Sequence, residues 1–244
     1  WFWYLIYLHK IHRSFSHIIT LVVFLFLSTI FLSNCTSNEF KGTTITNNQE
    51  IPSFKLTDQY NNSVITDDLD NQIIVLTFLY SECKEECKII VPIISKIQTE
   101  IINQYPDVAK EITFLSISVD PRNDIPENTY KYMQLNNKNP YWQTKEAQAN
   151  WIFLSGDLRK LEYIWSYYGI ATDAAIMDQG GVIEVISQKT MQELYDNKDN
   201  FPSYKINHSL PIYLIDKSSI TRVVYNDLKI DTEDIIHDIL LLAK

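Results

Sequence analysis

The sequence predicts an α/β protein with a central mixed sheet flanked by helices, and two observations lead to this prediction. Apolar runs alternate with segments of helical periodicity, which is typical of layered α/β domains with parallel strands. The last two apolar runs, 211–216 and 220–225, are separated only by Lys217-Ser218-Ser219 and predict an antiparallel hairpin. The parallel strands and the hairpin together make the expected sheet mixed.

The remaining elements follow in order along the chain. Strands are expected at 51–56, 73–80, 112–119 and 151–154. Helices are expected from about residue 89 to 103, over 128–135, over 158–168 and from 231 to 242. Asp157 is suited to cap the third of these helices and Gly169 to end it.

Residues 171–207 match none of these patterns. They contain Gly180-Gly181, and a connection of this length is unusual in a compact domain unless it folds locally. We therefore expect an inserted segment before the C-terminal hairpin, with structure of its own, beside the functional site.

Composition excludes one class of function. The chain is 45% hydrophobic, which is enough to bury a core, and its formal net charge is −9. Binding to a nucleic-acid backbone needs clustered Lys and Arg, and no long basic block is present. No nucleic-acid partner is expected.

The N-terminal region resembles a targeting segment. Lys10, His12 and Arg13 precede the uncharged stretch 18–34, whose length suits a signal-peptide core or a short membrane anchor. Basic residues ahead of such a stretch predict that the rest of the chain lies across the membrane from the cytoplasm.

The boundaries of the chain's parts follow from this. Residues 1–35 are expected to be a signal peptide or membrane anchor, residues 36–50 a polar linker, and residues 51–244 the folded domain. Leu32-Ser33-Asn34-Cys35 resembles a bacterial lipoprotein cleavage box, so Cys35 is either a lipidated residue or an incidental cysteine in an uncleaved anchor.

Cys83 and Cys87 are the candidate reactive centre. They follow the expected strand 73–80 and stand where the next helix starts, and residues four apart share one helix face. A helix N-terminus stabilises a thiolate, whereas the neighbouring acids Glu82, Glu85 and Glu86 raise thiol pKa values. The pair is a redox disulfide, part of a metal site or a static disulfide.

A metal site would need a further ligand, and His208 is the best placed candidate. Soft thiolates select Cu(I), and imidazole suits either copper oxidation state. His9, His12 and His17 lie in the targeting region, and His237 lies in the last expected helix. His208 precedes a strand that enters the sheet antiparallel, at the edge where the parallel strands end. The topology therefore allows His208 to lie beside the cysteines, although a single histidine is more often a structural residue.

Several motifs in a characteristic order resemble the SCO/SenC family of thioredoxin-fold copper proteins over roughly residues 50–243. They are Phe54-Lys55-Leu56-Thr57-Asp58-Gln59, the Cys83-x3-Cys87 pair, Ser116-Ile117-Ser118-Val119-Asp120-Pro121 with Arg122, Asp124 and Pro126, Trp151-Ile152-Phe153-Leu154-Ser155-Gly156-Asp157, Tyr168-Gly169-Ile170, and His208-Ser209 ahead of Tyr213-Leu214-Ile215-Asp216. Lys84 and Lys88 depart from the prolines that usually follow the family's two cysteines.

The resemblance implies a thioredoxin-like fold in which Cys83, Cys87 and His208 bind copper, as Cu(I), Cu(II) or both. It further implies a copper chaperone that assists assembly of the binuclear copper centre of cytochrome c oxidase, by copper delivery, by reduction of target cysteines, or by both. The implied partners are the copper-bearing oxidase subunit and other copper or thiol carriers. The implied location is a membrane, with the domain on the periplasmic side, at the cell surface or in the mitochondrial intermembrane space.

Three other functions compete with this one. An extracytoplasmic thiol–disulfide oxidoreductase would need Cys83 and Cys87 but not His208. A peroxidase of the peroxiredoxin class is disfavoured, because no Pro-x-x-x-Thr-x-x-Cys pattern precedes Cys83. A binding domain with an inert disulfide would leave the pair unreactive.

Overall fold

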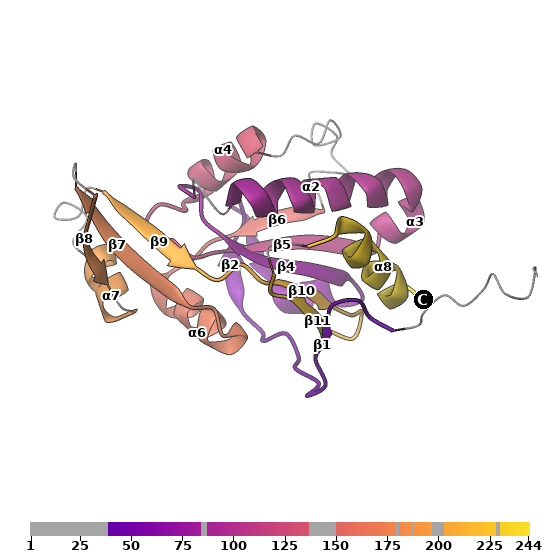
Figure 1. Cartoon of the computed structure of the whole chain (residues 1–244). Coiled ribbons are helices and arrows are strands. Elements are labelled where there is room, and N and C mark those ends of the chain that lie inside the picture. Colours follow the sequence, from indigo (N-terminus) through magenta and orange to yellow (C-terminus); the bar gives the residue numbers. More distant parts are fainter. Residues whose placement is uncertain are drawn as a thin grey trace, which may run out of the picture. The chain divides into compact units, whose positions relative to one another are not determined.

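A six-stranded sheet in the order β1-β11-β10-β4-β5-β6 forms the centre of the fold (Figure 1). β4, β5 and β6 are parallel, whereas β10 runs antiparallel to β4 and to β11, and β1 runs antiparallel to β11. The predicted mixed sheet is confirmed. In chain order these strands are β1 (Thr43–Thr44), β4 (Ile73–Leu79), β5 (Ile112–Ser118), β6 (Trp151–Leu154), β10 (Ile212–Ile215) and β11 (Thr221–Tyr225).

The structure is a computed structural model, and all these elements belong to the unit Phe40–Lys244. It describes residues 39–83, 87–136, 150–178, 181–186, 188–196, 203–227 and 230–244. The expected targeting segment 1–35, with Cys35, lies outside these ranges, as do Lys84, Glu85 and Glu86. Within the described ranges, no helix has the length and apolar character needed to cross a membrane.

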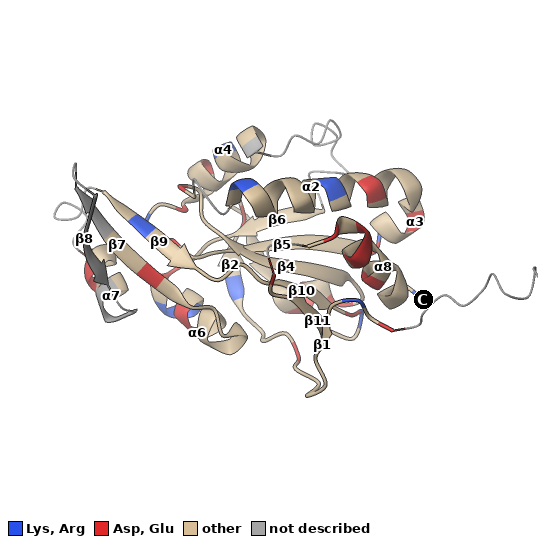
Figure 2. Cartoon of the chain, in the orientation of Figure 1, with Lys and Arg blue, Asp and Glu red and all other residues tan. Residues whose placement is uncertain are grey.

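Helices cover both faces of the sheet. α2 (Cys87–Gln104) and α8 (Thr232–Leu242) pack together on one side, and α6 (Leu158–Tyr168) lies on the other (Figure 1). Every residue of β4 and β5 is buried, and neither strand carries Lys, Arg, Asp or Glu (Figure 2). Their uninterrupted apolar character is what a parallel strand buried on both faces requires.

The cap and the terminator expected for α6 are present. The Asp157 side chain accepts a hydrogen bond from the Lys160 backbone N–H, and Gly169 ends α6 in the left-handed region with φ of 65°. Asp231 likewise accepts from the Glu233 N–H at the start of α8. These local signals set the helix boundaries that the sequence predicts.

Two elements differ from the predicted bounds. The strand expected over 51–56 is shorter and begins later, as β2 (Lys55–Thr57). It pairs with β3 (Ser63–Ile65), which is followed by the 3-10 helix η1 (Thr66–Leu69). Pro52 lacks an N–H, and the Phe54 N–H donates to the Thr66 side chain, so the earlier residues form no ladder. The helix expected over 128–135 is α4 (Pro126–Asn136), since proline is favoured in the first helical turn. A short helix, α3 (Pro106–Ala109), follows α2.

The inserted segment has structure of its own, as expected. It forms a three-stranded sheet in the order β8-β7-β9, together with α7 (Gln188–Asp196). β7 (Thr172–Asp178) pairs antiparallel with both β8 (Gly181–Ile186) and β9 (Tyr204–His208). β9 extends one residue past the predicted end of the insertion, so His208 closes a strand rather than standing in a loop.

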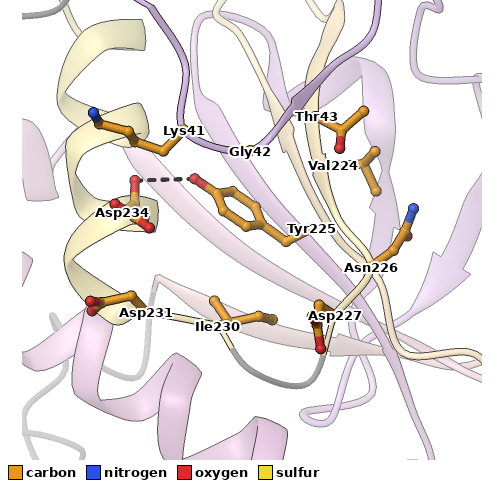
Figure 3. Close-up of a pocket in the computed structure, with 10 residues that line it drawn as sticks. All are labelled: Lys41, Gly42, Thr43, Val224, Tyr225, Asn226, Asp227, Ile230, Asp231 and Asp234. Atoms are coloured by element: carbon orange, nitrogen blue, oxygen red, sulfur yellow. Dashed lines mark hydrogen bonds between the residues drawn. The ribbon is translucent and has the colours of Figure 1, made fainter.

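The structure corrects the C-terminal part of the linker expected over 36–50. Thr43 and Thr44 form β1 and pair with Val224 and Val223 of β11. The residues just before β1 line a hollow that is also bounded by Tyr225 and by the start of α8 (Figure 3). A two-residue edge strand of threonines is too short and too polar to produce a strand period, which is why the segment was expected to be a linker.

Candidate metal and redox site

Cys83 and Cys87 form a disulfide at the carboxyl end of β4. β4 ends at Leu79, a turn closed by the hydrogen bond from the Cys83 N–H to the Tyr80 carbonyl follows, and Cys87 is the first residue of α2. The Cα atoms of the two cysteines are 5.8 Å apart. The side chains are only 8% and 2% exposed, respectively, so this disulfide is nearly enclosed.

His208 reaches the same edge of the sheet from a distant part of the chain. β10 begins four residues after His208, at Ile212, and runs antiparallel to β4, with Tyr213 opposite Leu76. A strand that enters antiparallel starts where its parallel neighbours end. One ligand atom each from Cys83, Cys87 and His208 lie within 4.8 Å of one another. The structure therefore brings together the three residues that the sequence analysis selected.

The hydrogen bond of the His208 ring leaves Nε2 as the nitrogen that could bind a metal. Nδ1 lies 2.9 Å from the Ser209 carbonyl oxygen, which can only accept, so Nδ1 carries the proton in this contact. The lone pair of the neutral ring is then on Nε2, which is buried. The Tyr80 ring meets the imidazole edge to face, with centroids 5.6 Å apart. Such contacts fix the tautomer and the ring plane of a ligating histidine.

This group of donors fits a soft metal ion once the disulfide is opened. A disulfide contains no thiolate, so two electrons must be added before both sulfurs become metal ligands. Two thiolates and an imidazole suit copper or zinc better than a hard cation. Ligand distances of about 2.3 Å for thiolate and about 2.0 Å for imidazole place two ligands of one ion at most about 4.6 Å apart. A group within 4.8 Å is close to that size.

The fifth histidine lies elsewhere. His237 belongs to α8, is partly exposed, and its Nδ1 lies 2.8 Å from Oδ1 of Asp238. It is not in the group formed by the two cysteines and His208. This agrees with the interpretation of His237 as an ordinary surface or boundary residue.

A buried carboxyl group supports the turn that carries Cys83. Asp124 accepts hydrogen bonds from the Ser81 backbone N–H at 2.8 Å and from the Ser118 hydroxyl at 2.5 Å. Burial raises the pKa of Asp124 to about 8, with a further contribution from the charge of Asp120, while the Ser118 and Ser81 hydrogen bonds oppose the shift. Burial in the folded state therefore favours the protonated form of Asp124.

Asp120, the partner of Asp124, joins this region to the inserted sheet. The Tyr204 hydroxyl of β9 lies 2.8 and 2.9 Å from the two Asp120 carboxylate oxygens and donates to this group. Burial raises the pKa of Asp120, and the hydrogen bonds from Tyr204 and Asn123 oppose that shift. The pKa of Tyr204 is also raised, first by burial and then by the Asp120 charge.

Sequence reasoning assigned no role to Asp120, Asp124 or Tyr204. Asp120 and Asp124 were noted only as part of a family motif. Their position just beyond the carboxyl end of β5, the parallel neighbour of β4, was a usable signal, because site residues collect at that edge. Tyr204 carried no comparable signal, since it lies inside the inserted segment.

Comparison with known proteins gives one family. A family model described as SCO1/SenC matches residues 42–244 of the chain. None of the curated proteins compared with the chain is similar to it.

Solved structures resemble the chain over most of their length. The copper-bound ScoI of Bradyrhizobium japonicum is 20% identical, with a TM-score of 0.58, covering 78% of this chain and 98% of that chain. A SCO1/SenC family lipoprotein from Bacillus anthracis is 22% identical, with a TM-score of 0.61, covering 84% and 100%. Copper-bound yeast Sco1 is 16% identical, with a TM-score of 0.57, covering 79% and 87%. These matches confirm the predicted α/β, thioredoxin-like fold.

Proposed function

Because the chain belongs to the SCO1/SenC family, we propose that it is a copper-binding protein that assists assembly of the binuclear copper centre of cytochrome c oxidase. The observation that carries the proposal is the convergence of Cys83, Cys87 and His208, whose ligand atoms lie within 4.8 Å of one another. These residues come from α2, from the turn before it and from β9, so the fold gathers a soft donor set from separate elements.

The reduced pair would hold copper through the two Cys Sγ atoms, with His208 Nε2 as the third ligand. Near-complete burial of Cys83 and Cys87 supports this assignment, because a nearly dry thiolate site protects bound Cu(I) from solvent. The Nδ1 hydrogen bond of His208 to Ser209 supports it further, since it leaves Nε2 as the donor. Copper is the cargo in this scheme, to be passed to the oxidase subunit.

The disulfide supports a second step at the same residues. When the Cys83 and Cys87 thiols reduce a disulfide in the target, their two electrons and two protons go to the target sulfurs, and the Cys83–Cys87 bond closes. The target thiols are then able to accept copper. Delivery and reduction use the same two sulfurs, so one molecule performs them in separate turns.

Location and partners complete the proposal. Residues 1–35 would attach the chain to a membrane as a signal-derived lipid anchor or a short spanning segment, with the domain outside the cytoplasm. That side is the periplasm or cell surface of a bacterium, or the mitochondrial intermembrane space. The partners would be the copper-bearing oxidase subunit and other copper or thiol carriers.

Copper stoichiometry tests the ligand set. The full chain in detergent, reduced and kept free of oxygen, is titrated with Cu(I) against a competing chelator. We expect one equivalent per chain, lost in Cys83→Ser and Cys87→Ser and weakened at least tenfold in His208→Ala. His237→Ala, at a histidine outside the group, is the matched control and retains parent affinity. The three-ligand site is wrong if His208→Ala binds copper as tightly as the parent.

The alternative is a thiol–disulfide oxidoreductase without an obligatory metal, which the Cys83–Cys87 disulfide favours. The reduced chain is mixed, without copper, with an oxidised peptide that contains two cysteines. An oxidoreductase reduces the peptide at the same rate in His208→Ala as in the parent. A chain that reduces the peptide but binds no copper supports the alternative over the main proposal.

A further inference from the structure

We propose that Tyr204 is a positioning residue that holds His208 against the cysteine pair through its hydrogen bonds to Asp120. The inference rests on the proposed role of His208 as a ligand. It concerns the inserted sheet, whose last strand ends at His208.

β9 is joined to the rest of the domain mainly by side chains. It belongs to the sheet β8-β7-β9 and not to the central six-stranded sheet. Its backbone pairs with β7, from Tyr204 opposite Ile176 to His208 opposite Thr172. These pairings fix β9 within the inserted sheet, but they do not fix the inserted sheet against the cysteines. The buried Ile206 side chain and the polar contacts of Tyr204 with residues that follow β5 help to do that.

Tyr204 supplies such a contact at the start of β9. Its hydroxyl lies 2.8 and 2.9 Å from the two oxygens of Asp120 and accepts from the Asn123 side chain at 2.7 Å. The Arg122 guanidinium lies 4.8 Å from the centre of its ring. Because side chains two or four apart share one face of a strand, Tyr204 and His208 lie on the same face of β9. Anchoring one end of that face therefore restrains the other.

The anchor of Tyr204 also supports the turn that carries Cys83. The Asp120 N–H donates to the Ser118 hydroxyl oxygen at 3.0 Å, and that hydroxyl donates a hydrogen bond to the Asp124 carboxyl group. Asp124 in turn accepts the Ser81 N–H, two residues before Cys83. Ser118, Asp120 and Asp124 thus form a buried, hydrogen-bonded frame at the end of β5 and just after it. This frame holds both the strand that carries His208 and the turn that carries Cys83. The relative position of the two ligands depends on this frame.

The far end of β9 is restrained separately. The Ser209 N–H donates to the Ala171 carbonyl, and the His208 ring meets Tyr80 edge to face. These contacts set the rotation of the imidazole. Loss of the Tyr204 hydroxyl would free β9 to shift, and the His208 ring would then move relative to Tyr80 and the cysteines.

Copper affinity of Tyr204→Phe tests the inference. This change removes one hydroxyl and keeps the ring that faces Arg122. Residues that orient a metal ligand typically contribute about 10–100-fold to metal affinity, and we expect a loss in that range for Cu(I) in the reduced full chain. In a His208→Ala background, the same change is expected to have no further effect.

Tyr225→Phe is the matched control. The Tyr225 hydroxyl donates to buried Asp238 at 2.6 Å, so this variant also removes a tyrosine–carboxylate hydrogen bond, but between β11 and α8. Its copper affinity is expected to stay within about threefold of the parent. A general loss of stability would affect the two variants alike, whereas a positioning role affects only Tyr204→Phe.

A metal-free readout separates this inference from the proposed function. In the oxidised chain, the NMR signals of the His208 ring depend on the Tyr80 ring beside it, and Tyr204→Phe is expected to shift them. The signals of His237, which contacts Asp238, are expected to shift in Tyr225→Phe instead. Asn123→Ala, which removes a donor to Tyr204 and keeps the tyrosine, is expected to act in the same direction and replaces Tyr204→Phe if that variant does not fold.

Different results would overturn the role of Tyr204 and the three-ligand site. The inference is overturned if Tyr204→Phe weakens copper binding no more than Tyr225→Phe does, or weakens it equally when His208 is absent. Unchanged His208 ring signals in Tyr204→Phe overturn it without any metal. If His208→Ala binds copper as the parent does, the three-ligand site fails and the inference fails with it.

Discussion

The backbone N–H of Cys87 points at Sγ of Cys83, 3.3 Å away, across the start of α2. The first N–H groups of a helix have no acceptor within the helix, and together they form its positive end. When the disulfide is reduced, this N–H faces the Cys83 sulfur. This contact would favour the thiolate form of Cys83 in the reduced pair.

Cys83 is expected to be the attacking thiol of the reduced pair. Its pKa should be lower than that of Cys87, and it is the more exposed sulfur, at 8% against 2%. The pH dependence of alkylation in Cys87→Ser and Cys83→Ser measures each thiol alone. A lower pKa for Cys87 than for Cys83 would contradict this assignment.

Stability is expected to fall as the pH rises towards 8 because of Asp124. Its pKa is raised from 3.8 to about 8 by burial and by the charge of Asp120. The folded state therefore holds a proton that the unfolded state has lost. The resulting stability is complete below the unfolded pKa of about 4 and is lost as the pH rises through about 8. Urea unfolding at several pH values measures the free energy of unfolding, which is expected to fall by about 1.4 kcal/mol per pH unit for each such proton.

Asp124→Asn should flatten that slope, because an amide keeps the hydrogen bonds to Ser81 and Ser118 without titrating. Asp107→Asn is the control, since Asp107 lies fully exposed and pairs with Lys110. Asp120 and Asp124 interact, so the remaining slope belongs to the pair rather than to one residue. If the slope is unchanged in Asp124→Asn, a group other than Asp124 causes the pH dependence of stability.

Local signals predicted local structure well. Asp157 and Gly169 bound α6 as expected, because a cap and a left-handed terminator act within one helical turn. The proximity of Cys83 to His208 was also predictable, because an antiparallel strand beside parallel ones brings its start to their ends.

The contact of Tyr204 with Asp120 was not predictable from the sequence. It depends on where an inserted sheet docks after β5, which no periodicity encodes. β1 was missed for a related reason, since Thr43 and Thr44 are too few for a pattern. Long-range placement of polar residues is therefore the part of this site that only the structure reveals.

Gly169→Ala is expected to lower the free energy of unfolding by about 1 kcal/mol. Gly169 ends α6 with φ of 65°, which a residue with a Cβ adopts only at a cost. A Cβ at this position would meet no atom within 4 Å, so the cost is purely conformational. Asparagine tolerates the left-handed region better than alanine does. The free energy of unfolding, measured with urea, should therefore fall less in Gly169→Asn than in Gly169→Ala. Equal stability of the alanine variant and the parent would show that α6 can end another way.

One buried carboxylate holds the start of the domain in place. Asp238 of α8 is fully buried, and its carboxylate accepts from the backbone N–H groups of Lys41 and Gly42 at 2.9–3.0 Å. The Tyr225 hydroxyl donates to the same carboxylate. This one side chain thus ties the segment before β1 to both β11 and α8.

Asp238→Ala is expected to cost about 3 kcal/mol of unfolding free energy, because it leaves several buried donors without their charged acceptor. The segment around Lys41 should also become sensitive to limited proteolysis while α8 stays intact. Asp234→Ala is the control on the same helix. It keeps the backbone carbonyl to which Tyr225 donates at 3.1 Å, as Figure 3 shows, and is expected to change stability by less than about 0.5 kcal/mol. Equal effects of the two variants would mean that α8 tolerates loss of the buried carboxylate, and that the pairing of β1 with β11 alone holds the start of the domain.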